Sequence, residues 1–270
     1  MVENAGDDGL IVCKSLSGNS GSFRWSANGL DVLGSGHIDA YVNAWAYRAL
    51  RNGTAIMKVL KDDKRSMICF DLAEKIKENY ARQLLNPETG CVAGWRSRDG
   101  MLHDYAFTFI NAAAIGYGLL DKKQAKNALN NLEELRSKTG VDIYEYGIPH
   151  NLLPISPLDH MLPRIINDLS PTFERYTDGA MSPYSLTLYL RALSINGFKK
   201  EASKLSEDYC RGLLSDNFTA GNGVGKEFHS WEGIPIGYEG TCVYSFPPLY
   251  SVAVELGIIK PEEPEWWLEG

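Results

Sequence analysis

The chain has 270 residues, of which 44% are apolar, a composition that supports a folded core and excludes a disordered protein. Its net charge of −7, with no long basic run, argues against a surface for nucleic acid or for anionic membranes. No apolar stretch reaches the ~18–20 residues that span a bilayer, and the first residues lack the pattern of a secretory signal, so we expect a cytoplasmic protein unless a signal was removed.

The cysteines and glycines exclude several kinds of site. The five cysteines are scattered along the chain and no C-x-x-C or H-E-x-x-H pattern occurs, so we expect reduced thiols and neither a metal site nor a cofactor. No glycine-rich loop of the P-loop or dinucleotide-binding type leads from a strand into an apolar helix. The sequence therefore predicts no nucleotide site.

Apolar residues recur mostly at helical spacing. Ser182 followed by Pro183 is a clear helix start, and Gly197 and Gly257 are plausible helix ends. A break is expected in the first helix near Asn52 and Gly53. The spacing predicts helices over residues 38–60, 64–85, 104–120, 122–138, 183–195, 199–214 and 241–256.

These predicted helices alternate in character. The first of each pair is apolar nearly all round and should be buried, whereas the second is amphipathic and charged and should face water. The connections from exposed to buried helices, at residues 86–103, 139–182 and 215–240, are long, which is typical of functional loops. In antiparallel pairs these loops emerge on one face. The pattern indicates an all-α fold, an α/α toroid of helical hairpins with a polar and aromatic mouth at one end.

The expected domain organisation is an irregular segment over residues 1–36 and a toroid over residues 37–270. The predicted helices make about four hairpins, whereas a closed ring of six hairpins needs twelve helices. The ring is therefore expected to be incomplete or open, or to be completed by another domain or another chain.

The long loops contain many tryptophan, tyrosine and acidic residues. Sugar rings present C–H faces that stack on aromatic side chains, and their hydroxyls bind polar groups, so the expected partner is a small carbohydrate. Hydrolysis of a glycosidic bond needs two carboxyl groups on different sides of that bond. The first loop contains Asp99 and Asp104, and the last contains Glu227, Glu232 and Glu239. Asp99, Glu239 and Glu232 are the candidate catalytic residues.

Each of these acids also has a structural explanation. Asp104 is expected to cap the helix that begins there, and Glu239 is a carboxylate favoured at a helix N-terminus. Asp99 could form an ion pair with Arg96 or Arg98, which would keep it ionised and suit it to the role of a base. The mouth residues expected to bind substrate are Trp95, Arg96, Arg98, His103, Asp104, His150, Asp178, His229, Trp231 and Tyr238. The three histidines suit a structural role as well as a sugar-binding one, and Asp178 is more typical of a turn.

At these residues the chain resembles a known family. The segments WRSRDGMLHDYAFTFINAAAIGYGLL, GIPHNLLPI, YTDGAMSPYSLTLYLRALSINGFKKEASKL and HSWEGIPIGYEGTCVYSF resemble the six-hairpin glycosidases. The segment HIDAYVNAWAYRALRNGTAIMKVL is similar to the trehalase-like and glucosidase-I-like members. The likeness covers roughly residues 30–257.

The resemblance implies an (α/α)6 barrel that hydrolyses glycosides with a pair of carboxylates, often with inversion and without a metal. It also implies one acid from a middle loop and one from the last loop, places that Asp99 and Glu239 match best and Glu232 next. The early hairpins of the family are missing from this chain.

Two other classes of function fit the same residues. A sugar epimerase or isomerase on the same toroid would use His103, His150 or His229 as acid-base groups. A carbohydrate-binding scaffold without catalysis would need only the aromatic mouth.

Overall fold

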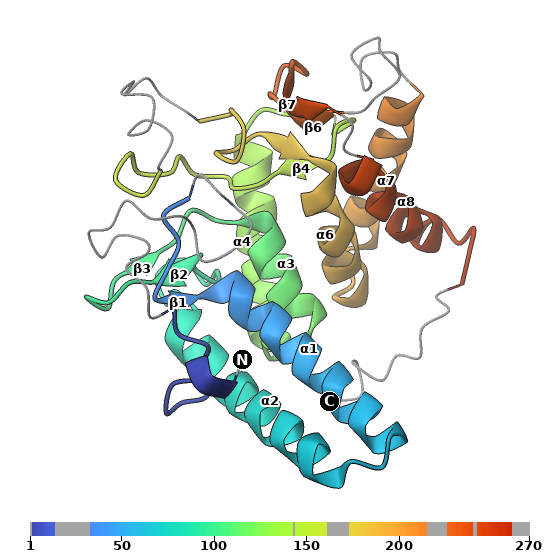
Figure 1. Ribbon diagram of the computed structural model, residues 1–270. Coiled ribbons are helices and arrows are strands. Elements are labelled where there is room, and N and C mark those ends of the chain that lie inside the picture. Colours follow the sequence, from blue (N-terminus) through green and yellow to red (C-terminus); the bar gives the residue numbers. More distant parts are fainter. Residues whose placement is uncertain are drawn as a thin grey trace.

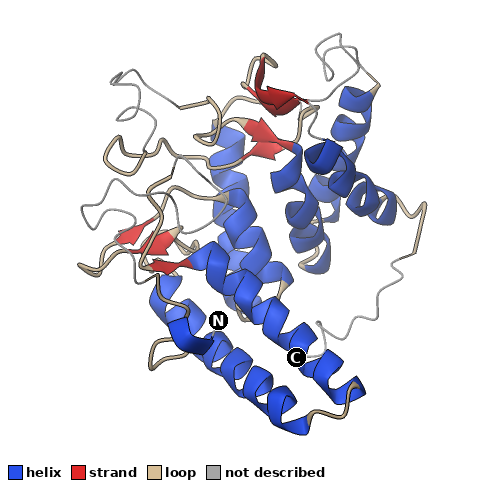
Figure 2. Ribbon diagram, in the orientation of Figure 1, coloured by secondary structure: helices blue, strands red, loops and turns tan. Residues whose placement is uncertain are grey.

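The computed structural model describes residues 2–13, 33–142, 144–160, 173–214, 226–239 and 242–260, without the side chains of residues 226, 237–239 and 242–247. This part of the chain is rich in helix (Figure 2). Its α-helices are α1 (Ala40–Val59), α2 (Asp63–Leu84), α3 (Thr108–Gly116), α4 (Lys122–Lys138), α6 (Pro183–Ile195), α7 (Lys199–Leu213) and α8 (Cys242–Glu255). A short 3-10 helix, η1 (Val2–Asn4), precedes them.

Side chains close the first turns of several helices. The carboxylate of Asp39 accepts the backbone N–H of Val42 at the start of α1. Asp121 and Gln124 form a capping box at the start of α4. The predicted start of α6 is confirmed, because Ser182 accepts a backbone N–H and Pro183 occupies the first turn. These caps satisfy N–H groups that have no partner inside the helix.

The helices form an inner row and an outer row (Figure 1). In the inner row α1 contacts α3, α3 contacts α6, and α6 contacts α8. In the outer row α2 packs on α1, α4 packs on α3, and α7 packs on α6. All residues of α3 are buried, as expected for an inner helix, whereas α2, α4 and α7 bury only one face. The predicted alternation of buried and exposed helices is confirmed for these elements.

The all-α expectation needs a correction, because two antiparallel sheets lie in the predicted loops. One sheet has the order β1-β2-β3, with β1 (Ile38–Asp39), β2 (Trp95–Arg96) and β3 (Leu102–His103). The other has the order β4-β5-β6-β7, with β4 (Ile148–Pro149), β5 (Met181–Ser182), β6 (Lys226–His229) and β7 (Pro235–Glu239). Since β1 runs directly into α1 and β5 into α6, the sheets fix the loops at the N-terminal ends of inner helices.

Two predicted helix boundaries are wrong, each for a local reason. α1 continues through Gly53, where a Cβ atom would lie 3.3 Å from Sγ of Cys69, so this glycine permits close packing against α2. The third helix begins at Thr108 instead of at residue 104. Ala106 has a φ of 53°, a left-handed conformation that an α-helix cannot include.

The described residues near the N-terminus pack on the helices. Leu10 is fully buried in the main core, and the backbone N–H of Ile11 donates to Oδ1 of Asn43 at 2.7 Å. Among the described helices, none combines the length and apolar character that a membrane span requires.

Candidate functional site

A row of aromatic side chains joins the N-terminal ends of three inner helices. Tyr41 belongs to the first turn of α1, Phe109 to α3 and Tyr184 to α6. The ring centroids of Tyr41 and Phe109 are 5.1 Å apart, those of Phe109 and Tyr184 are 6.5 Å apart, and the hydroxyls of the two tyrosines are hydrogen-bonded. The helix N-termini also carry partial positive charge. This end of the inner row is therefore both aromatic and electropositive.

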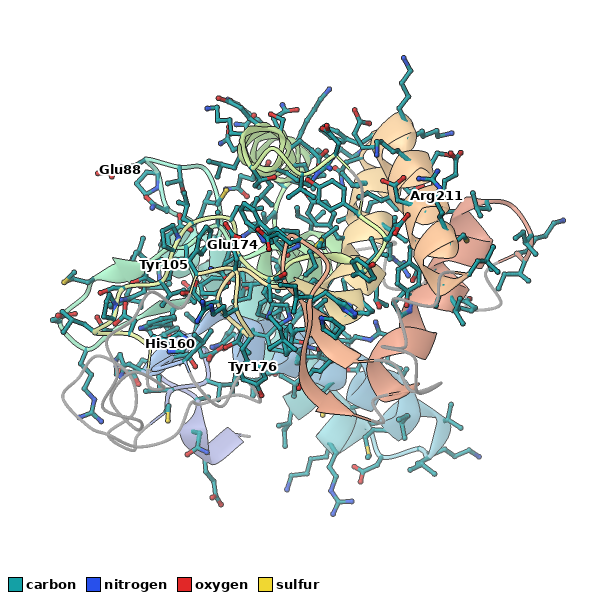
Figure 3. All side chains as sticks on the ribbon, turned by 90° about the horizontal axis from the view of Figure 1, so that it is seen from above. Glu88, Tyr105, His160, Glu174, Tyr176 and Arg211 are labelled. Atoms are coloured by element: carbon teal, nitrogen blue, oxygen red, sulfur yellow. The ribbon has the colours of Figure 1, made fainter. Side chains whose placement is uncertain are left out.

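The row continues into the loops and the second sheet. The ring of His150, just after β4, lies 4.7 Å from the ring of Phe109 and 5.0 Å from that of Phe228 in β6. Phe228 in turn contacts Tyr176 at 4.9 Å, edge to face. Segments that are distant in sequence thus meet at one end of the helices, as the long loops predicted. Figure 3 looks onto this end and shows Tyr176 and Glu174 among the loops that cover it.

His150 is held by its backbone while its imidazole is buried among rings. Its N–H donates to the carbonyl oxygen of Ala180 at 3.1 Å, and its own carbonyl accepts the N–H of Thr108 at 2.9 Å. Neither ring nitrogen has a hydrogen-bond partner among the described residues. Burial lowers the pKa of His150 from 6.5 to about 3, so the imidazole is neutral at physiological pH.

Two carboxyl groups from different loops lie near Trp231. The indole is half-buried, its ring contacts that of Phe173 at 5.4 Å, and its N–H donates to the carbonyl of Gly179 at 2.6 Å. Glu174 follows Phe173, and Glu232 follows Trp231. Burial and the negative charge of Glu232 raise the pKa of Glu174. Glu232 itself is exposed on the turn between β6 and β7.

The loop that contains Glu174 has an unusual backbone. Glu174 and Tyr176 have φ angles of 66° and 49°, which non-glycine residues seldom adopt. The loop is held by a pair of backbone hydrogen bonds between Arg175 and Asp178, at 3.1 and 3.0 Å, and by Gly179, whose N–H donates to Oδ1 of Asn151 at 2.9 Å. Such strain is frequent at functional sites.

Asp178, predicted to bind substrate, instead organises this loop. Its side chain is 1% exposed, and its Oδ1 atom accepts from Nδ2 of Asn151 at 3.0 Å and from the N–H of Ile155 at 3.1 Å. The alternative interpretation as a turn residue describes this geometry better.

The predicted residues of the first loop lie on the hairpin of β2 and β3. Asp99 is exposed near its tip, and its carboxylate accepts from Oγ of Ser97 and from the N–H of Met101. These hydrogen bonds lower the pKa of Asp99, so it is ionised. Arg96 donates to the carbonyls of Gln83 and Gly100 instead of to Asp99, and Arg98 is exposed.

Behind this hairpin lies a buried chain of hydrogen bonds. Nε2 of His103 lies 3.0 Å from Oγ of Ser97, and its Nδ1 lies 2.7 Å from Oδ2 of Asp159, which also accepts from the hydroxyl of Tyr105. Trp95 is 1% exposed and stacks on the imidazole at 4.6 Å. Trp95 and His103 are therefore packed inside the hairpin and offer no open surface to a sugar.

Asp104 does not cap α3. It accepts from Asn86 at 3.0 Å, from Thr89 at 2.5 Å and from the N–H of Ala106 at 3.0 Å. It closes the bend before the helix, and α3 has no side-chain cap at Phe107.

The last predicted residues lie on β6 and β7. His229 is buried and stacks on Tyr146 at 4.2 Å. Glu239 and Tyr238 belong to β7, and Glu239 pairs with Lys226, but their side chains lie outside the described residues. Asp99 and Glu232 occupy hairpins of different sheets, which Figure 1 shows well apart, so the structure does not bring these two predicted acids together.

Sequence reasoning missed Glu174, Asp159 and the first-turn aromatics of α1 and α6. A Tyr in the first turn of each of two apolar helices, at Tyr41 and Tyr184, was a usable signal. Nothing local distinguishes Glu174, because its neighbourhood to Glu232 depends on loop packing. In the part of the chain that is described, no group of three or more His, Cys, Asp and Glu side chains is placed to hold a metal ion.

The comparisons agree with the fold. No protein-family model and no curated protein matches the sequence. A GH63 mannosylglycerate hydrolase from Thermus thermophilus superposes on 80% of this chain and 45% of its own, with 18% identity and a TM-score of 0.56. A rhamnosidase from Klebsiella oxytoca superposes on 96% of this chain and 40% of its own, with 10% identity and a TM-score of 0.56.

A protein described as a sialidase superposes on 93% of this chain and 22% of its own, with 14% identity and a TM-score of 0.61. The chain thus spans less than half the length of each of these three structures. Its predicted likeness to the six-hairpin glycosidases is confirmed at the level of the fold, which it shares with barrel-type glycosidases over part of their length.

Proposed function

We propose that the protein hydrolyses a glycosidic bond in a small saccharide or glycoside at the N-terminal ends of α1, α3 and α6. The observation that carries this proposal is the pair Glu174 and Glu232, two carboxyl groups from different loops whose environments differ. Pairs of acids with pKa values pushed apart are a feature of glycosidase sites.

The two roles follow from the two environments. Glu174, whose pKa is raised by burial and by the charge of Glu232, suits a general acid that protonates the leaving oxygen. Glu232 is exposed, so water can reach it, and it suits a general base that activates that water. This division of labour corresponds to an inverting reaction. Of the acids predicted from sequence, Glu232 stays in the proposal and Glu239 stays a prediction, whereas Asp99 is replaced by Glu174.

Aromatic side chains next to these acids suit a sugar ring. Trp231 is half-buried and held in place by its hydrogen bond to Gly179, and Tyr176 is partly exposed. A fixed aromatic face that keeps some solvent contact can stack on the C–H face of a pyranose. The shared fold with glycosidases supports this choice of substrate class.

The barrel of this chain is proposed to be completed by another domain or chain. The inner row α1-α3-α6-α8 supplies four of the six inner helices that an (α/α)6 toroid needs, within the described residues. The similar structures are more than twice as long as the matched part. Activity is therefore to be tested on the chain alone and with any partner that copurifies.

The test compares Glu174→Gln and Glu232→Gln with the parent on a panel of aryl glycosides and oligosaccharides. Each variant is expected to lose about 10²-fold or more in kcat, the typical contribution of a general acid or base. Glu88→Gln, which removes an exposed carboxylate elsewhere, is the matched control. Asp99→Asn and Glu239→Gln test the pair predicted from sequence in the same assay.

Sugar binding is measured separately through the fluorescence of Trp231, with Trp231→Phe as the reference. Parental kcat in both glutamine variants, on a sugar that is turned over, would contradict the proposed pair. Saturable binding without turnover would favour a carbohydrate-binding scaffold, and isomerisation at the reducing end without bond cleavage would favour an epimerase or isomerase.

A further inference from the structure

A second pocket lies at the opposite end of the inner helices from the proposed glycosidase site. It has a volume of about 330 Å³, within the roughly 300–1,000 Å³ range of small-molecule sites. Tyr117 and Asn196, the C-terminal caps of α3 and α6, both line it. The proposed glycosidase site is instead at the N-terminal ends of the same two helices, so the two sites are separate.

The pocket exists because α3 is short. α3 has 9 residues and α1 has 20, so their lengths are about 14 and 30 Å at 1.5 Å per residue. Beyond the end of α3 the inner row is left without a helix, and the space is bounded by Tyr47 of α1, Ile195 of α6 and Ala125 of α4. Gly118, with a φ of 75°, turns the chain away beside it.

The charged groups that line this pocket are all positive. Lys77 of α2 and Lys122 of α4 are among its lining residues, which include no carboxylate. Neither lysine has a salt-bridge partner within the described part of the chain. The guanidinium of Arg48 lies over the ring of Tyr117, 5.1 Å from its centroid, and adds a third positive charge.

The carboxylates closest along the chain are already engaged. Glu74 pairs with Arg51 at 3.4 Å, and that arginine also donates to the hydroxyl of Tyr47. Asp121 accepts the N–H of Gln124 as the cap of α4. The positive charge of Lys77 and Lys122 is thus left without a neutralising partner in the pocket.

We propose that this pocket binds a small organic anion, with Lys77 and Lys122 holding its phosphate or carboxylate group and the rings of Tyr47 and Tyr117 packing against its body. Ammonium groups bind such oxygens through charge-assisted hydrogen bonds. A lysine pair without the aromatic walls would attract any anion equally, whereas these walls favour an anion that has a sugar or other ring attached.

The probes are glucose 6-phosphate, glucuronate, inorganic phosphate and glucose, titrated by calorimetry into the full chain. Glucose 6-phosphate or glucuronate is expected to bind more tightly than inorganic phosphate, and the stronger of the two identifies the anionic group. The location is read from the rate of lysine acetylation, measured by peptide mass spectrometry. Bound anion should protect Lys77 and Lys122 but not Lys123, an exposed neighbour on the same helix.

Two kinds of variant test the site itself. The double change Lys77→Gln and Lys122→Gln should weaken binding about tenfold or more, the equivalent of one lost charge-assisted hydrogen bond. Ile195→Trp should also weaken it, because this residue is 45% exposed at the pocket rim and a larger ring fills the space. Lys123→Gln and Leu214→Trp, at a residue 90% exposed elsewhere, are the controls for charge and for bulk.

The proposal is overturned if no probe anion binds saturably at millimolar concentration, if binding survives the double lysine change, or if Lys123 is protected equally. The Glu174→Gln variant should bind the anion as the parent does. Failure of the glycosidase proposal is therefore distinguishable from failure of this one.

Discussion

Replacing His150 should remove a specific part of the pH dependence of stability. The imidazole lies between Phe109 and Phe228, and burial lowers its pKa to about 3, against 6.5 for an unperturbed histidine. Between these two pH values the unfolded chain binds a proton that the folded chain does not. Stability from this group is therefore present in full above pH 6.5 and is lost as the pH falls towards 3.

The size of the effect follows from the two pKa values. Between pH 7.5 and pH 5.0, linkage predicts a loss of about 2 kcal/mol in the free energy of unfolding from His150 alone. This is a large part of the roughly 5–15 kcal/mol by which domains are stable. His150→Leu removes the titrating group and also an imidazole N–H without a hydrogen-bond partner, so at pH 7.5 the variant should be at least as stable as the parent.

The assay is urea unfolding of the parent and of His150→Leu at both pH values. The quantity of interest is the difference between the two proteins in the loss of stability, since carboxylates that titrate elsewhere affect both equally. Tyr184→Phe is the control, because it alters the same aromatic row and keeps the imidazole, so it should retain the parental loss. Equal losses in the parent and in His150→Leu would refute the assignment of a buried neutral imidazole.

Three further outcomes are expected. Gly212→Ala should lower the free energy of unfolding by more than about 2 kcal/mol despite the better helix propensity of alanine, because its Cβ would lie 1.9 Å from the carbonyl oxygen of Glu145; a more stable variant in urea would contradict this packing. Ser182→Ala should cost ~1 kcal/mol in the same assay through loss of the α6 cap, and an unchanged midpoint would speak against that cap. Cys91, whose pKa burial raises to about 12, should react with iodoacetamide at pH 8 far more slowly than half-buried Cys69; equal rates by peptide mapping would argue against its burial.

Much of the helical framework was predictable from local signals. The helix that begins at Pro183 starts where a Ser-Pro pair predicts it, and the helix over residues 122–138 has the predicted limits. The apolar residues of α3 identified a buried helix correctly. Its first residue was missed because the turn at Ala106 adopts a positive φ, which a sequence pattern does not reveal.

The candidate site was predictable as a region but not as a set of contacts. The long loops do meet at one end of the inner helices, yet Trp95 and His103 stack on each other inside a hairpin and Asp178 fastens a loop. Residue type and spacing cannot distinguish a polar side chain that is buried with partners from one that lines an opening. That distinction depends on which loops pack against it.

Periodicity and capping residues, read along the chain, determined the helices, their alternation between buried and exposed, and the likeness to barrel glycosidases, because those features depend on neighbours within one or two turns. Tertiary structure alone decided that two sheets join the loops and that Glu174 lies within electrostatic reach of Glu232. It also decided that a lysine-lined pocket opens beneath the short helix α3. A two-residue strand such as β2 has no local stability of its own, and it exists only because distant segments of the chain are brought beside it.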